Sequence, residues 1–147
     1  MSARMPEQAL PVGVSDVETF VSQLNKAFLT LDYKDYPVTN EASCRAFASV
    51  FLAGAGLPTQ TETHNALGRS DLEFSIGDTL WVLEFKYARD KSRKEKPEAR
   101  KEQGLAQIDK RMYGRQGAEK WLKRVSLVFS ENRRQIVQFE EREPIEL

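Results

Sequence analysis

The sequence contains only one cysteine, Cys44, and this scarcity excludes one way of stabilising a small protein. An intrachain disulfide needs two cysteines, so no disulfide framework can hold this chain together. A lone thiol is compatible with a reducing compartment, and we expect a cytoplasmic location. Cys44 falls on the apolar face of a predicted helix, and no histidine or other base is indicated nearby. We therefore interpret it as a core residue and not as a nucleophile.

Long apolar runs and a recognisable targeting segment are also missing. No run approaches the roughly 20 apolar residues that cross a bilayer, and residues 1–13 lack the basic start and apolar stretch of a secretory signal. We expect no membrane association, and a secreted, toxin-like effector is the alternative to a cytoplasmic protein. Residues 1–14 are predicted to form a flexible tail, and residues 15–147 a single domain with one hydrophobic core.

An excess of positive charge is absent as well. Lys plus Arg and Asp plus Glu each number 22, so the formal net charge at pH 7 is zero. A strongly basic composition would favour binding to nucleic acid, and this composition does not. The charge is unevenly distributed, however, because residues 86–101 contain eight Lys or Arg against three Asp or Glu.

Two N-terminal segments show apolar residues at spacings of three and four, which indicates amphipathic helices. The first helix is predicted to begin after Ser15 or Asp16, since either side chain can cap a helix N-terminus. The second is predicted to begin near Asn40 and to be ended by Gly54 and Gly56, with Pro58 preventing its continuation. The apolar positions of the two helices are Val17, Phe20, Val21, Leu24, Phe28 and Leu31, followed by Cys44, Phe47, Ala48, Phe51 and Leu52.

The spacing then changes to every second residue, which is typical of β-strands. Residues 71–76 alternate between polar and apolar, Gly77 and Asp78 provide a tight turn, and residues 79–87 are rich in β-branched and aromatic side chains. These segments predict a hairpin whose second strand is the more buried. A shorter strand is predicted before them, near residues 57–62.

The C-terminal part of the chain predicts one more helix and two more strands. A lysine-rich loop over residues 89–100 is followed by a helix over residues 101–116, with Trp121 closing that helix against the core. Strands are predicted at residues 125–129 and 135–139. The order α-α-β-β-β-α-β-β predicts an α/β domain with a central mixed sheet flanked by helices.

Three charged residues of the hairpin form a candidate site. Asp71 begins the first strand, and Glu84 and Lys86 lie near the end of the second, on the same face as apolar Leu80 and Val82. Buried charges are costly unless they are paired or bind a metal, and the hairpin can bring Asp71 close to Glu84. Two carboxylates and a lysine suit Mg²⁺, whose ligands are oxygens. On spacing alone the alternative stays open that these are solvated charges at strand ends.

Over most of its length the chain resembles the PD-(D/E)XK nuclease superfamily, whose fold is that of restriction endonucleases. The resemblance rests on Gly68-Arg69-Ser70-Asp71 and Glu84-Phe85-Lys86, together with Asn40-Glu41, Thr61-Glu62, Leu105-Ala106-Gln107-Ile108 and Tyr113. Within the superfamily, the chain looks most like a nuclease-like domain that follows an ATPase-like domain in bacterial proteins. The resemblance implies a restriction-endonuclease-like core that hydrolyses phosphodiester bonds with Mg²⁺ or Mn²⁺ as its cofactor.

The resemblance also implies roles for individual residues. Asp71 and Glu84 would be metal ligands, while Lys86 would orient the attacking water or stabilise negative charge on the phosphate. Glu41 matches an additional acid near the metal, or else is a first-turn glutamate favoured by the helix dipole. Gln107 is expected either to touch the substrate or to hold Lys86 in place.

Several further residues are candidates for contact with nucleic acid. Tyr113 matches the same helix motif as Gln107, or else is a packing residue, and Arg69 matches the family without a defined role. His64 is interpreted as a base near Asp71 or, alternatively, as a surface histidine. The basic residues of the loop are either an arm that contacts phosphates or a solvated connection. They are Lys91, Arg93, Lys94 and Lys96.

We therefore predict a Mg²⁺-dependent endonuclease or exonuclease that acts on DNA. The alternative is a catalytically silent module that keeps the nuclease fold and binds nucleic acid or protein, a reading that the neutral net charge favours. DNA is the expected partner, and an ATPase-like domain or a regulatory protein is a further one. The choice between DNA and RNA, the sequence specificity and the oligomeric state, including a dimer, stay open.

Overall fold

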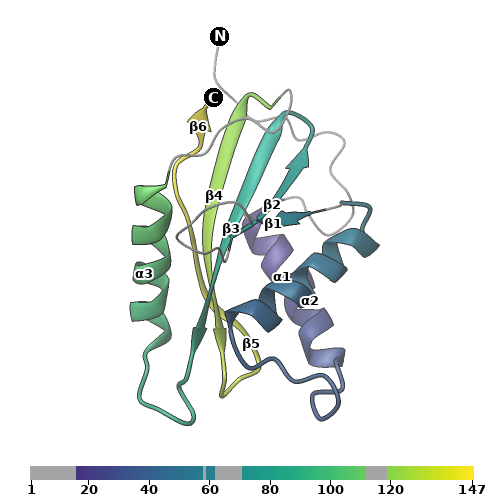
Figure 1. Ribbon diagram of the computed structural model, residues 1–147, viewed down its shortest axis with the longest axis vertical. Helices are drawn as coiled ribbons and strands as arrows, with labels where there is room; N and C mark the ends of the chain where they lie inside the picture. The colour runs from purple at the N-terminus through teal and green to yellow at the C-terminus, as the bar shows by residue number, and fades with distance from the viewer. Residues whose placement is uncertain (1–15, 58, 62–70, 112–118) are drawn as a thin grey trace.

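The computed structural model describes residues 16–57, 59–61, 71–111 and 119–147 (Figure 1). The tail expected over residues 1–14 lies outside these ranges. The helices are α1 (Val17–Thr30), α2 (Glu41–Gly54) and α3 (Pro97–Lys110). The strands are β1 (Gln60–Thr61), β2 (Asp71–Ile76), β3 (Thr79–Ala88), β4 (Trp121–Ser130), β5 (Gln135–Glu141) and β6 (Ile145–Glu146). The predicted order of elements is confirmed, with β6 as an unpredicted addition.

The strands form one mixed sheet in the order β1-β2-β3-β4-β5, and β6 pairs with β4. β2 and β3 are antiparallel and joined by the predicted Gly77-Asp78 turn, in which Gly77 has the positive φ of 59° that glycine adopts without strain. β3 and β4 are parallel, and the chain passes between them through α3. This arrangement confirms the predicted α/β class with a central mixed sheet.

Helices cover both faces of the sheet. α1 and α2 lie on one face and α3 lies on the other (Figure 1). β3 is central and is therefore covered on both sides, so each of its side chains is buried except that of Lys86, which is partly exposed. Charged residues on this strand consequently lie in the interior of the domain.

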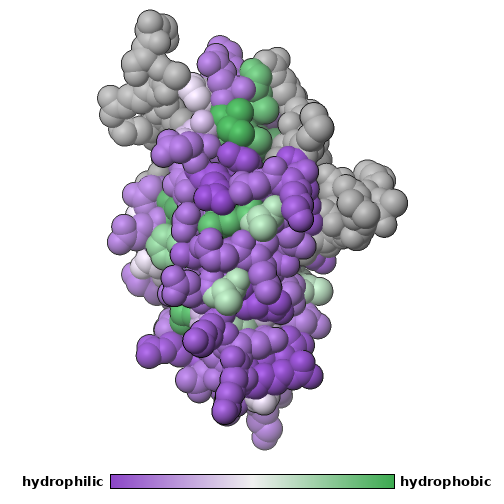
Figure 2. All heavy atoms as spheres, turned by 90° about the vertical axis from the view of Figure 1, so that its left-hand side faces the viewer, coloured by the Kyte–Doolittle hydropathy of each residue, from purple (hydrophilic) through white to green (hydrophobic). Residues whose placement is uncertain are grey.

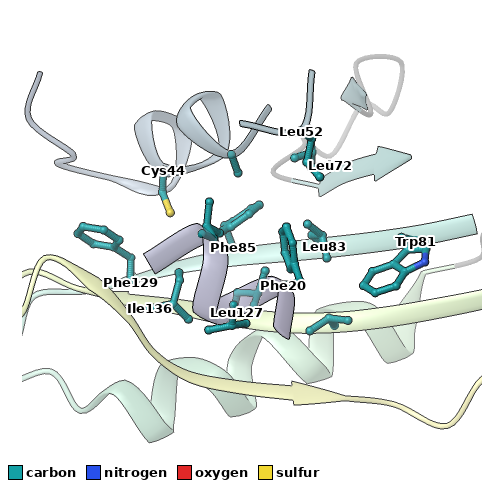
Figure 3. Close-up of a cluster of buried hydrophobic side chains, with 14 of the residues drawn as sticks. Phe20, Cys44, Leu52, Leu72, Trp81, Leu83, Phe85, Leu127, Phe129 and Ile136 are labelled. Atoms are coloured by element: carbon teal, nitrogen blue, oxygen red, sulfur yellow. The ribbon is translucent and has the colours of Figure 1, made fainter. Parts of the chain in front are cut away.

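The larger core lies between the sheet and the pair α1 and α2. Phe20, Phe85 and Phe129 are fully buried there, and Cys44 projects into the same cluster (Figure 3). Burial raises the pKa of the Cys44 thiol well above its usual range. The interpretation of Cys44 as a core residue is confirmed, because a nucleophilic cysteine needs a stabilised thiolate.

Both N-terminal helices begin where the sequence predicts. The Asp16 side chain accepts a hydrogen bond of 2.6 Å from the Thr19 amide, which lowers the pKa of the Asp16 carboxyl. Asn40 and Ser43 form a reciprocal capping box at the start of α2. These caps fix the position of Glu41 as the first helical residue of α2.

The third helix differs from its prediction. It runs from Pro97 to Lys110 instead of over residues 101–116, so the lysine-rich loop is shorter than expected. Pro97 occupies the first turn, where a proline has no amide bond to lose, and therefore starts the helix instead of interrupting it. Arg111 already has an extended backbone, with φ −92° and ψ 147°. Trp121, expected to close that helix, is the first residue of β4.

Candidate active site

Glu84 and Lys86 lie on the face of β3 that α3 covers. Their neighbours on this face, Leu80 and Val82, are buried in a separate small cluster with Leu122. The alternate residues of β3, among them Trp81 and Phe85, belong to the larger core on the opposite face. The predicted division of β3 into two faces is therefore confirmed.

Asp71 and Glu84 are directly opposite each other in the antiparallel ladder of β2 and β3. Directly opposed positions in such a ladder share a face of the sheet, with Cβ atoms about 4.5–5.5 Å apart in general. The backbone register is thus the one that a site built from both acids requires. The side chain of Asp71 lies outside the described part of the structure, so a contact between the two carboxylates stays a prediction.

Glu84 is fully buried and has two cations beside it. Arg111 donates a hydrogen bond of 2.8 Å from Nη1 to Glu84 Oε1. The Nζ atom of Lys86 lies 3.9 Å from Glu84 Oε2. A carboxylate removed from water needs such compensation, because isolated charges are expensive to bury. Arg111 and Lys86 therefore stabilise the Glu84 carboxylate at a buried strand position, where an apolar side chain is usual.

Arg111 was not among the residues that the sequence suggested. Its position in the sequence is nevertheless informative. Arg111 follows the buried Ile108 by three residues, so it continues the inward face of α3 just past the last helical residue. Its side chain is 15% exposed. A cation placed at the end of a buried helical stripe indicates a buried anion opposite it.

Lys86 is positioned by a close approach of α3 to the sheet. A Cβ atom on Gly104 would overlap Ser126 Oγ and would lie 3.4 Å from Lys86 Cγ. Ser126 in turn donates a hydrogen bond of 3.0 Å to the Lys101 carbonyl, which ties β4 to α3. Glycine at residue 104 therefore lets the helix pack directly against the strand pair that carries Lys86.

Gln107 lies one turn before Arg111 on α3. Its Oε1 atom is buried and has no hydrogen-bond partner among the residues that the structure describes. A buried acceptor without a partner is costly, and such groups are commonly satisfied by a bound water or a ligand. Gln107 is thus an available acceptor on the helix that covers the Glu84 face.

The comparison with protein families agrees with this arrangement. A family model described as the PD-(D/E)XK nuclease superfamily matches residues 39–139, which is more than half of the chain. The chain belongs to the PD-(D/E)XK nuclease superfamily. No match was found among curated proteins or among solved structures.

Membership in the PD-(D/E)XK superfamily confirms the restriction-endonuclease-like fold and gives a nuclease-type function at the level of the superfamily. Nucleic acid is accordingly the class of substrate, and divalent metals are the cofactors that these nucleases generally use. Among the side chains that the structure describes, no group of three or more His, Cys, Asp or Glu gathers in metal-binding geometry. The side chain of Asp71 is not among them, so a metal site formed by Asp71 and Glu84 stays a prediction.

Glu41 has a cationic partner on α3. Arg100 Nη2 lies 3.8 Å from Glu41 Oε1, and Arg100 also donates a hydrogen bond of 3.1 Å from Nε to the Tyr87 carbonyl. Arg100 thereby connects the start of α2 to the end of β3. This ion pair gives Glu41 a structural role, and its role as an additional metal ligand stays a prediction.

The lysine-rich loop is tied to the turn between β4 and β5. Glu131 Oε1 accepts hydrogen bonds from the backbone amides of Lys91 and Ser92, at 3.1 and 2.7 Å. Asp90 Oδ2 accepts a further bond of 2.6 Å from Ser130 Oγ. The loop backbone is thus held by acids, while four basic side chains are left exposed. They are Lys91, Arg93, Lys94 and Lys96.

The surface on the α3 side of the molecule is predominantly hydrophilic (Figure 2).

Three residues predicted near the site, His64, Arg69 and Tyr113, lie outside the described ranges, so their predicted roles stay predictions. No helix within the described ranges is long and apolar enough to cross a membrane.

Proposed function

We propose that this protein is a nuclease that hydrolyses phosphodiester bonds in DNA with a divalent cation, Mg²⁺ or Mn²⁺. One observation carries the proposal beyond the superfamily: Asp71 is the register partner of Glu84, and Lys86 follows Glu84 on the same face. The two acids and the lysine of the superfamily motif therefore belong to adjacent positions of one hairpin. An unrelated pattern of strand-end charges would not require this register or the burial of Glu84.

The residues at this position fit a hard divalent cation. Asp71 and Glu84 would hold it through carboxylate oxygens, which are the ligands that Mg²⁺ prefers. Glu41 is a candidate for a further acid, and Gln107, whose buried Oε1 has no partner among the described residues, is a candidate to touch the substrate or hold Lys86 in place. When bound, the cation polarises the phosphate and lowers the pKa of a bound water.

Lys86 supplies the positive charge that the phosphate needs. Its side chain is only 12% exposed, and its stem packs beside Gly104. An ammonium held in a poorly hydrated site stabilises developing negative charge more strongly than one in bulk water. We assign Lys86 to orienting the attacking water or to stabilising the charge on the phosphate.

DNA binding would use groups around this centre. The exposed cations of residues 91–96 are suited to sequence-independent contact with phosphates. Gln107 is the candidate on α3 for direct contact with the substrate. Arg69 and Tyr113 complete the proposed contacts on the basis of the superfamily resemblance.

The proposal is tested by incubating the purified protein with supercoiled plasmid and Mg²⁺ or Mn²⁺, with and without a chelator. Nicking or linearisation that the chelator abolishes is the expected result. Glu84→Gln should remove the activity, whereas Glu18→Gln, at an exposed position of α1, should leave it intact. Binding of the plasmid without cleavage under either metal would favour the catalytically silent module instead.

A further inference from the structure

Glu84 is held by an arginine at the position where a metal would need it. The guanidinium of Arg111 lies 2.8 Å from Oε1, and the carboxylate is completely buried. Lys86 lies near the other oxygen, at 3.9 Å from Oε2. Both oxygens of the proposed metal ligand thus already face cations.

The position of Arg111 is fixed by the end of α3. Its amide still donates to the Ile108 carbonyl at 3.3 Å, while its own backbone is extended, so it is the C-cap of the helix. Upstream, α3 is anchored to the sheet by the close approach of Gly104 to Ser126. The backbone of Arg111 therefore stays near Glu84, but its long side chain is 15% exposed and has a path to solvent.

We propose that Arg111 is a positioning residue that neutralises Glu84 in the metal-free protein and leaves the carboxylate when a divalent cation binds. The inference rests on the proposed metal site at Asp71 and Glu84. A cation held by Glu84 would bind a carboxylate oxygen that now faces Arg111 or Lys86. A guanidinium on the same small group would then be repelled by a double positive charge at short range.

This exchange makes Arg111 a competitor of the metal. Metal binding has to break a charge-assisted hydrogen bond to the buried Glu84 carboxylate. This bond therefore stabilises the metal-free protein and lowers its affinity for the metal. A variant without the guanidinium should bind the cation more tightly, although its metal-free form is less stable. A residue with a merely structural role would lower stability without raising metal affinity.

The test is calorimetric titration of the full chain with Mn²⁺ alone, without nucleic acid. The variants are Arg111→Met, which removes the charge, and Arg111→Lys, which keeps it. Arg142→Met is the matched control, because Arg142 makes a similar pair with Asp109 of α3, at 3.1 and 2.8 Å, outside the proposed site. We expect Arg111→Met to bind Mn²⁺ about tenfold more tightly, with Arg111→Lys and Arg142→Met near the parent.

Thermal unfolding provides the second readout and needs no activity. Arg111→Met should unfold at a lower temperature than the parent without metal, and saturating Mn²⁺ should raise its unfolding temperature by more than that of the parent. If Arg111→Met does not fold without metal, Arg111→Gln replaces it in both measurements. Unchanged or weaker Mn²⁺ binding by Arg111→Met, or by Arg111→Gln where it replaces Arg111→Met, would overturn this inference without overturning the proposed function. No Mn²⁺ binding by the parent would overturn the proposed function as well.

Discussion

Gly104 of α3 lies so close to Ser126 of β4 that a single added methyl group would overlap the serine hydroxyl. This contact is what allows the helix to cover Glu84 and Lys86 closely. The packing of residue 104 and its helix propensity favour different residues, because glycine in the middle of a helix lowers stability by about 0.5–1 kcal/mol relative to alanine. The conflict is resolved by the packing, which leaves no room for a side chain.

Gly104→Ala should therefore destabilise the protein, by about 1–3 kcal/mol, despite the better helix propensity of alanine. Gly54→Ala is the matched control, because a Cβ on this residue of α2 would meet nothing within 4 Å. It should be neutral or slightly stabilising. Urea unfolding of the two variants measures the difference. Adding Ser126→Gly to Gly104→Ala removes the overlapping side chain and should recover part of the loss; equal stability of both alanine variants would contradict the contact.

The hairpin was predictable from the sequence because its determinants are local. A two-residue turn at Gly77-Asp78 fixes the register of the flanking strands, and counting outward from it pairs Asp71 with Glu84. The same alternation separates Trp81 from Val82 and gives β3 its two faces. The N-caps Asp16 and Asn40 were equally local, and the starts of both helices were confirmed.

The contacts of α3 were not predictable in this way. Their geometry depends on the parallel pairing of β3 with β4, which brings Ser126 beside Glu84 across a long crossover. The start of the helix was placed too late because Pro97 was interpreted as part of a loop. The predicted helix extends past Lys110, so Arg111 does not stand out in the sequence as the C-cap residue that pairs with Glu84. A glycine in the middle of a helix, as at residue 104, is a sequence feature that is compatible with such close packing.

Cys44 should be unreactive towards a thiol reagent in the folded protein. Its side chain is fully buried and its thiol pKa is raised by desolvation, so the thiolate that reacts is scarcely populated at pH 8. Mixing with Ellman's reagent should release colour only after denaturant is added, with one thiol per chain. Rapid reaction without denaturant would show that the core around α2 opens readily.

Lys86→Ala should abolish cleavage while leaving the fold and much of the metal binding in place, because Lys86 is assigned to the transition state and not to the metal. Asp71→Ala and Glu84→Ala should instead weaken metal binding directly. Plasmid cleavage and Mn²⁺ titration of the three variants separate these roles, with Lys34→Ala as an exposed lysine control outside the proposed site and the basic loop. If Lys86→Ala cleaves the plasmid as fast as the parent, Lys86 has no role in catalysis and is only a charged residue near the end of a strand.

The exposed cations of the loop between β3 and α3 offer the sharpest choice between a DNA-contacting arm and a solvated connection. Glu131 accepts hydrogen bonds from the backbone amides of Lys91 and Ser92, so alanine substitutions should leave the loop conformation intact. Replacing Lys91, Arg93, Lys94 and Lys96 together should weaken DNA binding on all sequences. Each lost phosphate contact should lower the slope of log affinity against log salt by about one unit.

Binding measured over a salt series decides between the two roles of this loop. Cleavage at saturating DNA should survive in the four-fold variant, because none of its residues is assigned to the metal. A double variant of Lys26 and Lys34, which are exposed before α2, controls for the loss of positive charge in general. If both variants show the parental slope, the loop is a solvated connection and DNA is held elsewhere. Asp90, Glu95 and Glu98 interrupt the basic run. The change in the slope of log affinity against log salt measures how far these acids offset the positive charge of the loop.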